Sequence, residues 1–128
     1  MSEFVEVKTQ SLEFGALDWC IAQIEKLNVE LTPPNYGNGI ALVFIVGTDP
    51  LYRPSTDWES GGALIEKYAV TLTPFAISFG GDPSYWLAQP WDQRVMPVDG
   101  PTPLVAACRA IVASVLGDTV SVPKELLS

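Results

Sequence analysis

The chain of 128 residues contains no histidine, only two cysteines and only seven basic residues. Without histidine, a serine or threonine nucleophile lacks its commonest activating base, and a zinc site lacks a usual ligand. The seven lysines and arginines are scattered and form no stripe that could neutralise a phosphate backbone, so direct nucleic-acid binding is not expected. Fifteen acidic residues bring the net charge to −8, which also disfavours binding to an anionic membrane surface.

Long hydrophobic runs are also missing. The longest, residues 40–46, is far shorter than the roughly 20 residues that span a bilayer. The N-terminus shows no basic segment followed by an apolar stretch, so we expect a cytoplasmic protein. Cys20 and Cys108 fall within apolar helical patterns, and we interpret them as free, buried cysteines because cytosolic redox conditions oppose a disulfide between the two helices.

What the chain does contain is typical of a folded protein. Hydrophobic residues make up 48% and charged residues 17%, and the length suits a single domain over residues 1–128. Two apolar patterns with helical spacing predict the main helices. Ser11 is expected to N-cap the first, which runs to about residue 27. Thr102 is expected to cap the second, with Pro103 at its first position and Gly117 after its end.

Apolar runs that alternate or continue over a few residues predict strands. These lie at residues 4–8, 29–31, 40–46, 70–75, 85–89 and 120–122. The run at 40–46 is interpreted as a strand that is buried on both faces or central to a sheet. Residues 63–68 suit a short helix, and residues 32–38 and 80–83 are typical of turns. Because helices and strands interleave irregularly, we predict an α+β fold, a two-layer domain of mainly antiparallel sheet packed against two main helices.

The helical spacing also predicts which faces are buried. The first buried face comprises Leu17, Cys20, Ile21, Ile24 and Leu27, and the second comprises Leu104, Val105, Cys108, Ile111, Val112, Val115 and Leu116. Trp19 lies nearly opposite the first face. It either packs under a neighbouring strand or loop, or forms a ligand wall or subunit contact. Arg109 lies at the edge of the second face, where its head can reach solvent or a site.

Residues 52–62 combine aromatic rings, short polar side chains and glycines, and we interpret them as a loop of the kind that carries function. Ser55 and Thr56 could be nucleophiles, but neither histidine nor an adjacent lysine is present to activate them. Asp57 could join nearby carboxylates in a metal site, although capping of local backbone amides is the favoured interpretation. No metal and no cofactor are predicted.

Aromatic residues are the stronger functional clue. Five of them fall in or near expected turns, namely Tyr52, Trp58, Tyr85, Trp86 and Trp91. They either close the core or form an aromatic wall at which Arg53, Arg94 or Arg109 could pair a phosphate while a base stacks. An aromatic pocket with converging polar groups is the usual binding-site hypothesis.

Four segments together resemble the NinX-like family of small phage and prophage proteins. They are Lys8-Thr9, Gly15-Ala16-Leu17-Asp18-Trp19, Tyr52-x-Pro54-Ser55-Thr56-Asp57-Trp58-x-x-Gly61-Gly62-x-x-Ile65-Glu66, and Gly100-Pro101-Thr102-Pro103-Leu104-x-Ala106-Ala107-x-Arg109. The resemblance spans nearly the whole chain. It departs from the family at Ala63, where proline is common, and in residues 32–38 and 76–84, which look longer here.

The resemblance implies a phage accessory protein without an assigned biochemical activity. Our hypothesis is a binding protein, rather than an enzyme, that holds a small polar or nucleotide-like molecule; sequestration of a host defence signal is one version. The candidate ligand-binding residues are Asp18, Trp19, Tyr52, Ser55, Thr56, Asp57, Trp58 and Arg109. The alternative is an acidic protein that binds and inhibits a host enzyme. An enzyme is least favoured because no set of acid, base and nucleophile is evident, and the sequence leaves a homo-oligomer open.

Overall fold

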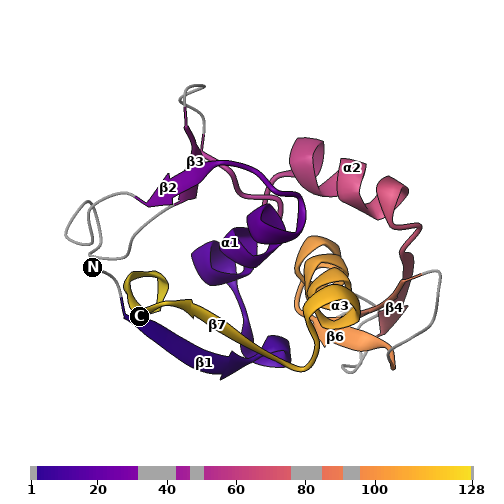
Figure 1. The fold of residues 1–128 in the computed structure, drawn as a ribbon. Coiled ribbons are helices and arrows are strands. Elements are labelled where there is room, and N and C mark those ends of the chain that lie inside the picture. The colour runs from indigo at the N-terminus through magenta and orange to yellow at the C-terminus, as the bar shows by residue number, and fades with distance from the viewer. Residues whose placement is uncertain (1–2, 32–42, 47–50, 76–84, 91–95, 128) are drawn as a thin grey trace.

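The computed structural model describes residues 3–31, 43–46, 51–75, 85–90 and 96–127. Figure 1 shows the chain path through the elements. In order they are β1 (Phe4–Lys8), the 3-10 helix η1 (Thr9–Ser11), α1 (Phe14–Ile24), β2 (Val29–Leu31), β3 (Val43–Ile45), α2 (Trp58–Lys67), β4 (Thr71–Phe75), β5 (Tyr85–Gln89), β6 (Val98–Gly100), α3 (Pro103–Leu116), β7 (Thr119–Pro123) and the 3-10 helix η2 (Lys124–Leu126). The predicted α+β class is confirmed.

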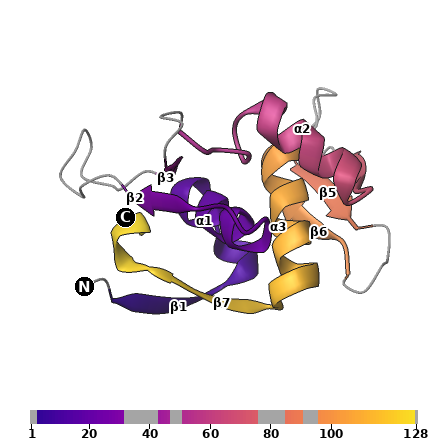
Figure 2. The same cartoon turned by 45° about the horizontal axis from the view of Figure 1, so that its top comes forward.

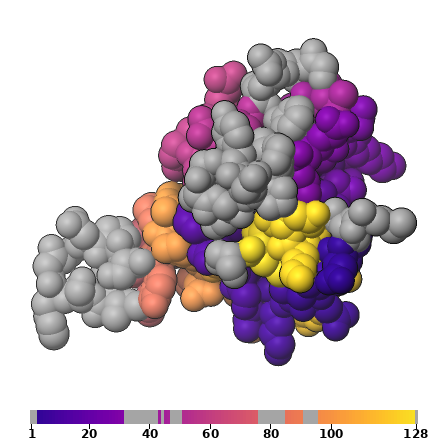
Figure 3. All heavy atoms as spheres, turned by 90° about the vertical axis from the view of Figure 1, so that its left-hand side faces the viewer, coloured from indigo at the N-terminus to yellow at the C-terminus, as the bar shows by residue number. Residues whose placement is uncertain are grey.

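The described strands form three small antiparallel sheets, β1–β7, β2–β3 and β4–β5–β6. In Figures 1 and 2 these sheets surround α1 and α3, with β1–β7 below both helices and β4–β5–β6 beside α3. Because β1 pairs with β7, the two ends of the chain lie together, and Figure 3 shows η2 (yellow) at the surface beside β1 (indigo). The strand predictions near residues 4–8, 29–31, 71–75, 85–89 and 120–122 are confirmed.

Two points on the strands differ from prediction. Within the described part of the chain, β3 belongs to a two-stranded sheet with β2 rather than to the centre of a larger sheet, although its Val43 is buried as predicted. Residues 40–42 lie outside the described residues, as do the predicted turns at 32–38 and 80–83. The strand β6 was not predicted, because three residues between Pro97 and Pro101 give too short a pattern to show alternation.

Helices α1 and α3 pack against each other at the centre and carry most of the core. Thr102 Oγ1 accepts a hydrogen bond from Val105 N at 3.1 Å, and Gly117 ends α3 with φ 99°, so both predicted caps are confirmed. The β4–β5–β6 sheet packs on α3 at close range. A Cβ on Gly100 would lie 2.6 Å from Ala106 N, so only glycine permits this approach.

The buried faces of α1 and α3 are largely as predicted. Cys20 and Cys108 are both buried and free, as expected. Two residues of the predicted faces are the exceptions. Val115 and Leu116, in the last turn of α3, are exposed. No helix in the described ranges has both the length and the apolar character needed to cross a membrane.

Helix α1 begins two residues later than predicted and is not capped by Ser11. Ser11 belongs to η1, and Glu13 is the N-cap residue without a side-chain cap. The reason is a tertiary contact at Thr9, which donates from Oγ1 to Gly117 O and from N to Asp118 O, at 2.6 and 2.8 Å. These bonds hold the chain in a 3-10 turn before α1 can start.

Helix α2 corrects the prediction of a loop over residues 52–62. The helix begins at Trp58, five residues before the predicted short helix, because Asp57 caps it by accepting from Glu59 N at 3.3 Å. Glycine has low helix propensity, so Gly61 and Gly62 in the sequence indicated a loop. Gly61 is required by packing instead, since a Cβ there would collide with the carbonyl oxygen of Pro54.

Helix α1 holds α2 through two carboxyl groups that are seven residues apart and therefore lie on the same face of α1. Near the start of α2, Asp18 Oδ1 accepts from Ser55 N at 2.8 Å. At the end of α2, Glu25 accepts from Lys67 Nζ at 2.8 and 2.9 Å and from the Tyr68 hydroxyl at 2.6 Å. These contacts fix the segment that leads into α2 against α1.

Candidate functional site

Residues 51–56, before α2, lie against the first turns of α1 and leave a cavity of about 120 Å³. We call it the Asp18 pocket. Its lining residues are Phe14, Gly15, Asp18, Val43, Leu51, Tyr52, Arg53 and Thr56. Three of the eight residues predicted for the site therefore share one cavity with Arg53, whose positive charge acts on Asp18.

Asp18 is the most unusual group in this pocket. The residue is buried, with only 4% of its surface exposed. Burial raises the pKa of this carboxyl from 3.8 to about 6, against the opposing effects of the Ser55 N–H, the Ser55 hydroxyl and the positive charge of Arg53. Near neutral pH the carboxyl is thus close enough to its pKa to take either form. It can accept a hydrogen bond as carboxylate or donate one as acid.

A tight turn presents the polar residues of the segment. Thr56 N and Asp57 N both donate to Arg53 O, at 3.1 and 2.9 Å. Tyr52 is fixed to β3 by a bond from its N to Val43 O at 2.8 Å, and burial raises the pKa of its half-buried phenol, so the hydroxyl stays protonated as a hydrogen-bond donor.

Ser55 supports Asp18 but does not face the cavity. The residue is 1% exposed, and its hydroxyl has no hydrogen-bond partner of good geometry among the described residues. It is absent from the lining of the Asp18 pocket. Ser55, one of the two candidate nucleophiles, is therefore buried outside the lining of the pocket, and its backbone N–H holds Asp18 in place.

Phe14 was missed by sequence reasoning. It lines the pocket, is 63% exposed and has φ 51°, a left-handed conformation that is rare for a bulky residue. Such backbone strain clusters at binding sites and active sites. No sequence signal predicts a positive φ at phenylalanine; the exposed ring could be found only from the structure.

The other predicted residues lie elsewhere. Asp57 uses its carboxylate on Glu59 N and on the hydroxyl of Ser60, the latter at 3.0 Å, which agrees with the favoured interpretation of a local cap. Trp58 is 58% exposed on the first turn of α2 and does not line the Asp18 pocket.

Trp19 and Arg109 also lie outside the pocket. The Trp19 ring packs on the ring of Phe4 in β1, with 5.9 Å between centroids, so its packing under a neighbouring strand is the interpretation that the structure favours. Arg109 donates from Nε to Leu12 O at 2.8 Å and from a terminal nitrogen to Asp99 O at 3.0 Å. Of the eight predicted residues, the structure therefore places Asp18, Tyr52 and Thr56 at the pocket and the other five outside its lining.

The protein is an α+β protein in which a buried carboxyl opens on a small cavity with polar and apolar walls. It belongs to the bacteriophage P22 NinX family, because the model of that family matches residues 8–115. This match confirms the resemblance seen in the sequence and supports a phage-encoded accessory protein. Comparison with curated proteins finds no match.

Proposed function

We propose that this phage accessory protein is a binding protein whose Asp18 pocket holds a small polar group without cleaving it. The observation that carries the proposal is the Asp18 carboxyl itself, which is nearly excluded from water and yet lines a cavity. Ionisable groups with strongly shifted pKa values in cavities are enriched at functional sites. Binding rather than cleavage is favoured because the Ser55 hydroxyl does not line the cavity, and because the lining that presents the Thr56 hydroxyl contains no histidine or lysine to activate it.

The lining indicates what kind of group would fit. Asp18 accepts or donates hydrogen bonds, Arg53 and Thr56 donate them, and Val43 and Leu51 provide apolar walls. A ligand group that carries a donor and an acceptor side by side on a flat apolar body, such as an amide or the edge of a base, satisfies all of these.

Cavity volume limits the size of the buried part. About 120 Å³ is well below the roughly 300 Å³ at which pockets enclose a drug-sized ligand. A nucleotide-like molecule would therefore insert only its polar edge, and the remainder would lie outside against exposed groups such as Phe14. Sequestration of a nucleotide-like host signal is compatible with this mode, in which affinity comes from the inserted edge and the rim.

The test begins with the purified protein. Heat release followed by mass spectrometry of the supernatant identifies any molecule that copurifies, and a thermal-shift series with that molecule, or with nucleosides and simple amides, gives its effect on stability. Saturation to about 100 times Kd stabilises a folded protein by about 2.7 kcal/mol. We expect this shift in the wild type and in Trp58→Ala, and its loss in Asp18→Asn, which retains the shape of the side chain. Retention in Asp18→Asn would remove the pocket from the proposal.

A second candidate function rests on Trp58. An exposed tryptophan is unusual on a surface, and this residue type is enriched among the residues that dominate protein interfaces. With a net charge of −8, the partner would be a basic surface of a host protein, such as an enzyme that the phage protein inhibits. Pull-down of the same host protein by the wild type and Asp18→Asn, but not by Trp58→Ala, would favour this function over ligand binding.

A further inference from the structure

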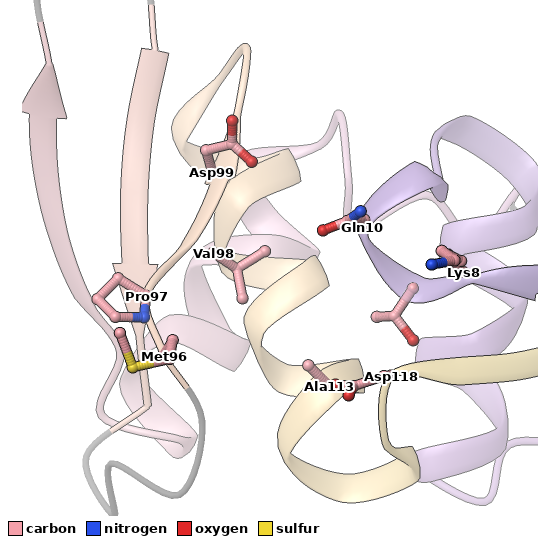
Figure 4. A pocket seen from close by; sticks show the side chains of 9 residues that line it. Lys8, Gln10, Met96, Pro97, Val98, Asp99, Ala113 and Asp118 are labelled. Carbon is pink, nitrogen blue, oxygen red and sulfur yellow. The ribbon is translucent and has the colours of Figure 1, made fainter.

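A second and larger cavity lies beside α3, between the end of β1 and β6. Its volume is about 500 Å³, within the range of ligand sites. Figure 4 shows β6 and the residues before it on one side and η1 with the end of β1 on the other. We call it the β1–β6 cleft. None of the eight ligand-binding residues predicted from the sequence lines this cleft.

The walls of this cleft are fixed by hydrogen bonds. Arg109 connects them, because it donates to Leu12 O after η1 and to Asp99 O in β6. Thr9 ties the end of β1 to the link between α3 and β7 through its bonds to Gly117 O and Asp118 O. The cleft is therefore preformed, which lowers the entropic cost of binding. Arg109, which the sequence suggested as a ligand-binding residue, acts here as a positioning residue.

Three charged residues from three different elements line the cleft. Lys8 comes from β1, Asp99 from β6 and Asp118 from the link after α3. Figure 4 shows them on different sides of the cavity, with Lys8 opposite β6. Within the described ranges no salt bridge or side-chain hydrogen bond uses any of these three charges. The three lining charges sum to −1, and the Arg109 guanidinium, which does not line the cleft, interacts electrostatically with Asp99.

Charge complementarity selects the ligand class. A molecule that matches one positive and two negative groups carries one negative and two positive groups of its own. A basic amino acid has this pattern, with one carboxylate and two cationic groups joined by a short aliphatic chain. The apolar lining from Val98, Ala113 and Met96 suits that chain, since lysine and arginine stems pack on apolar surface.

We propose that the β1–β6 cleft binds a free basic amino acid, with its carboxylate on Lys8 and its two cationic groups on Asp99 and Asp118. This site is separate from the Asp18 pocket, so it does not depend on the proposed function. The amide of Gln10, which extends from η1 toward the cavity, supplies a further hydrogen bond.

The experiment titrates L-lysine into ¹⁵N-labelled protein at millimolar concentrations and follows the backbone amide signals of Gln10, Val98 and Asp99. Three matched probes each lack one charge: norleucine lacks the side-chain ammonium, Nα-acetyl-lysine lacks the α-ammonium and cadaverine lacks the carboxylate. Each is expected to bind roughly tenfold or more weakly than lysine, the effect of losing one hydrogen bond to a charged group.

Variants assign the charges. Lys8→Met is expected to bind lysine and cadaverine equally, because the carboxylate no longer has a partner. Asp99→Asn and Asp118→Asn should each weaken lysine binding roughly tenfold, whereas the control Asp18→Asn should leave it unchanged. Absence of lysine-dependent shifts in the wild type, or binding that Lys8→Met and Asp99→Asn leave unaltered, would overturn the proposal. Thermal melts of each variant establish that it is folded.

Discussion

Replacement of Asp18 by asparagine should make the protein more stable at neutral pH and remove part of its pH dependence. The pKa of Asp18 rises from 3.8 to about 6 on folding, so between these values the folded protein binds more protons than the unfolded chain. Stability therefore falls as the pH rises through this window. Each pKa unit corresponds to about 1.4 kcal/mol, so the full contribution above pH 6 is about 3 kcal/mol of lost stability.

Asparagine can still accept the hydrogen bond from Ser55 N but carries no charge to desolvate. The assay is urea unfolding, followed by tryptophan fluorescence, of wild type and Asp18→Asn at pH values from 4 to 8. The difference in free energy of unfolding should change by about 2.4 kcal/mol in favour of the variant between pH 4 and pH 7. With an m-value of about 1–3 kcal/mol/M, this shifts the midpoint by roughly 1 M or more. A difference that stays constant across the pH range would refute the reasoning about a desolvated carboxyl.

Two further predictions concern the attachment and packing of α2. Gly61→Ala should destabilise the fold by about 1–3 kcal/mol because the new Cβ meets Pro54 O. The neighbouring Gly62→Ala should stabilise the fold by up to about 1 kcal/mol, since the nearest contact of its Cβ is at 3.9 Å. Equal effects of the two substitutions in chemical unfolding would contradict the packing argument. Glu25→Gln should cost about 1 kcal/mol at pH 7 by weakening the bonds from Lys67, and because the pKa of Glu25 is lowered on folding, this cost should shrink as the pH falls below 4.5. A cost that does not depend on pH would show that the charge of Glu25 is not the cause.

Much of the fold could be predicted because local signals agree with the tertiary structure. The caps of α3 at Thr102 and Gly117 depend only on neighbouring residues, and both are found. The start of α1 was missed because it depends on a distant contact, since Thr9 bonds to the end of α3 and delays α1. The start of α2 was missed because Gly61 and Gly62 indicated a loop, whereas Gly61 is required by packing against Pro54.

The candidate site shows the same limit. The sequence identified Asp18, Tyr52 and Thr56, which the fold brings to one cavity from α1 and from the segment before α2. It could not identify Phe14, whose backbone conformation has no sequence signature, or separate Trp58 and Arg109 from the pocket. Helical spacing assigns a residue to a face of its own helix, but which segment covers that face is decided by tertiary packing.

The energetic role of Asp18 strengthens the argument for the pocket. Glu25 occupies the same face of α1 and its pKa is lowered, so its charge contributes stability at neutral pH. Asp18 makes a comparable contact with the segment before α2, yet its charge reduces stability, and asparagine would make the same hydrogen bond without that cost. A purely structural role therefore does not explain the carboxyl. A ligand that donates a hydrogen bond or positive charge to Asp18 would lower its pKa and recover part of the lost free energy on binding. Affinity for such a ligand should then increase between pH 5 and pH 7, the range in which Asp18 ionises.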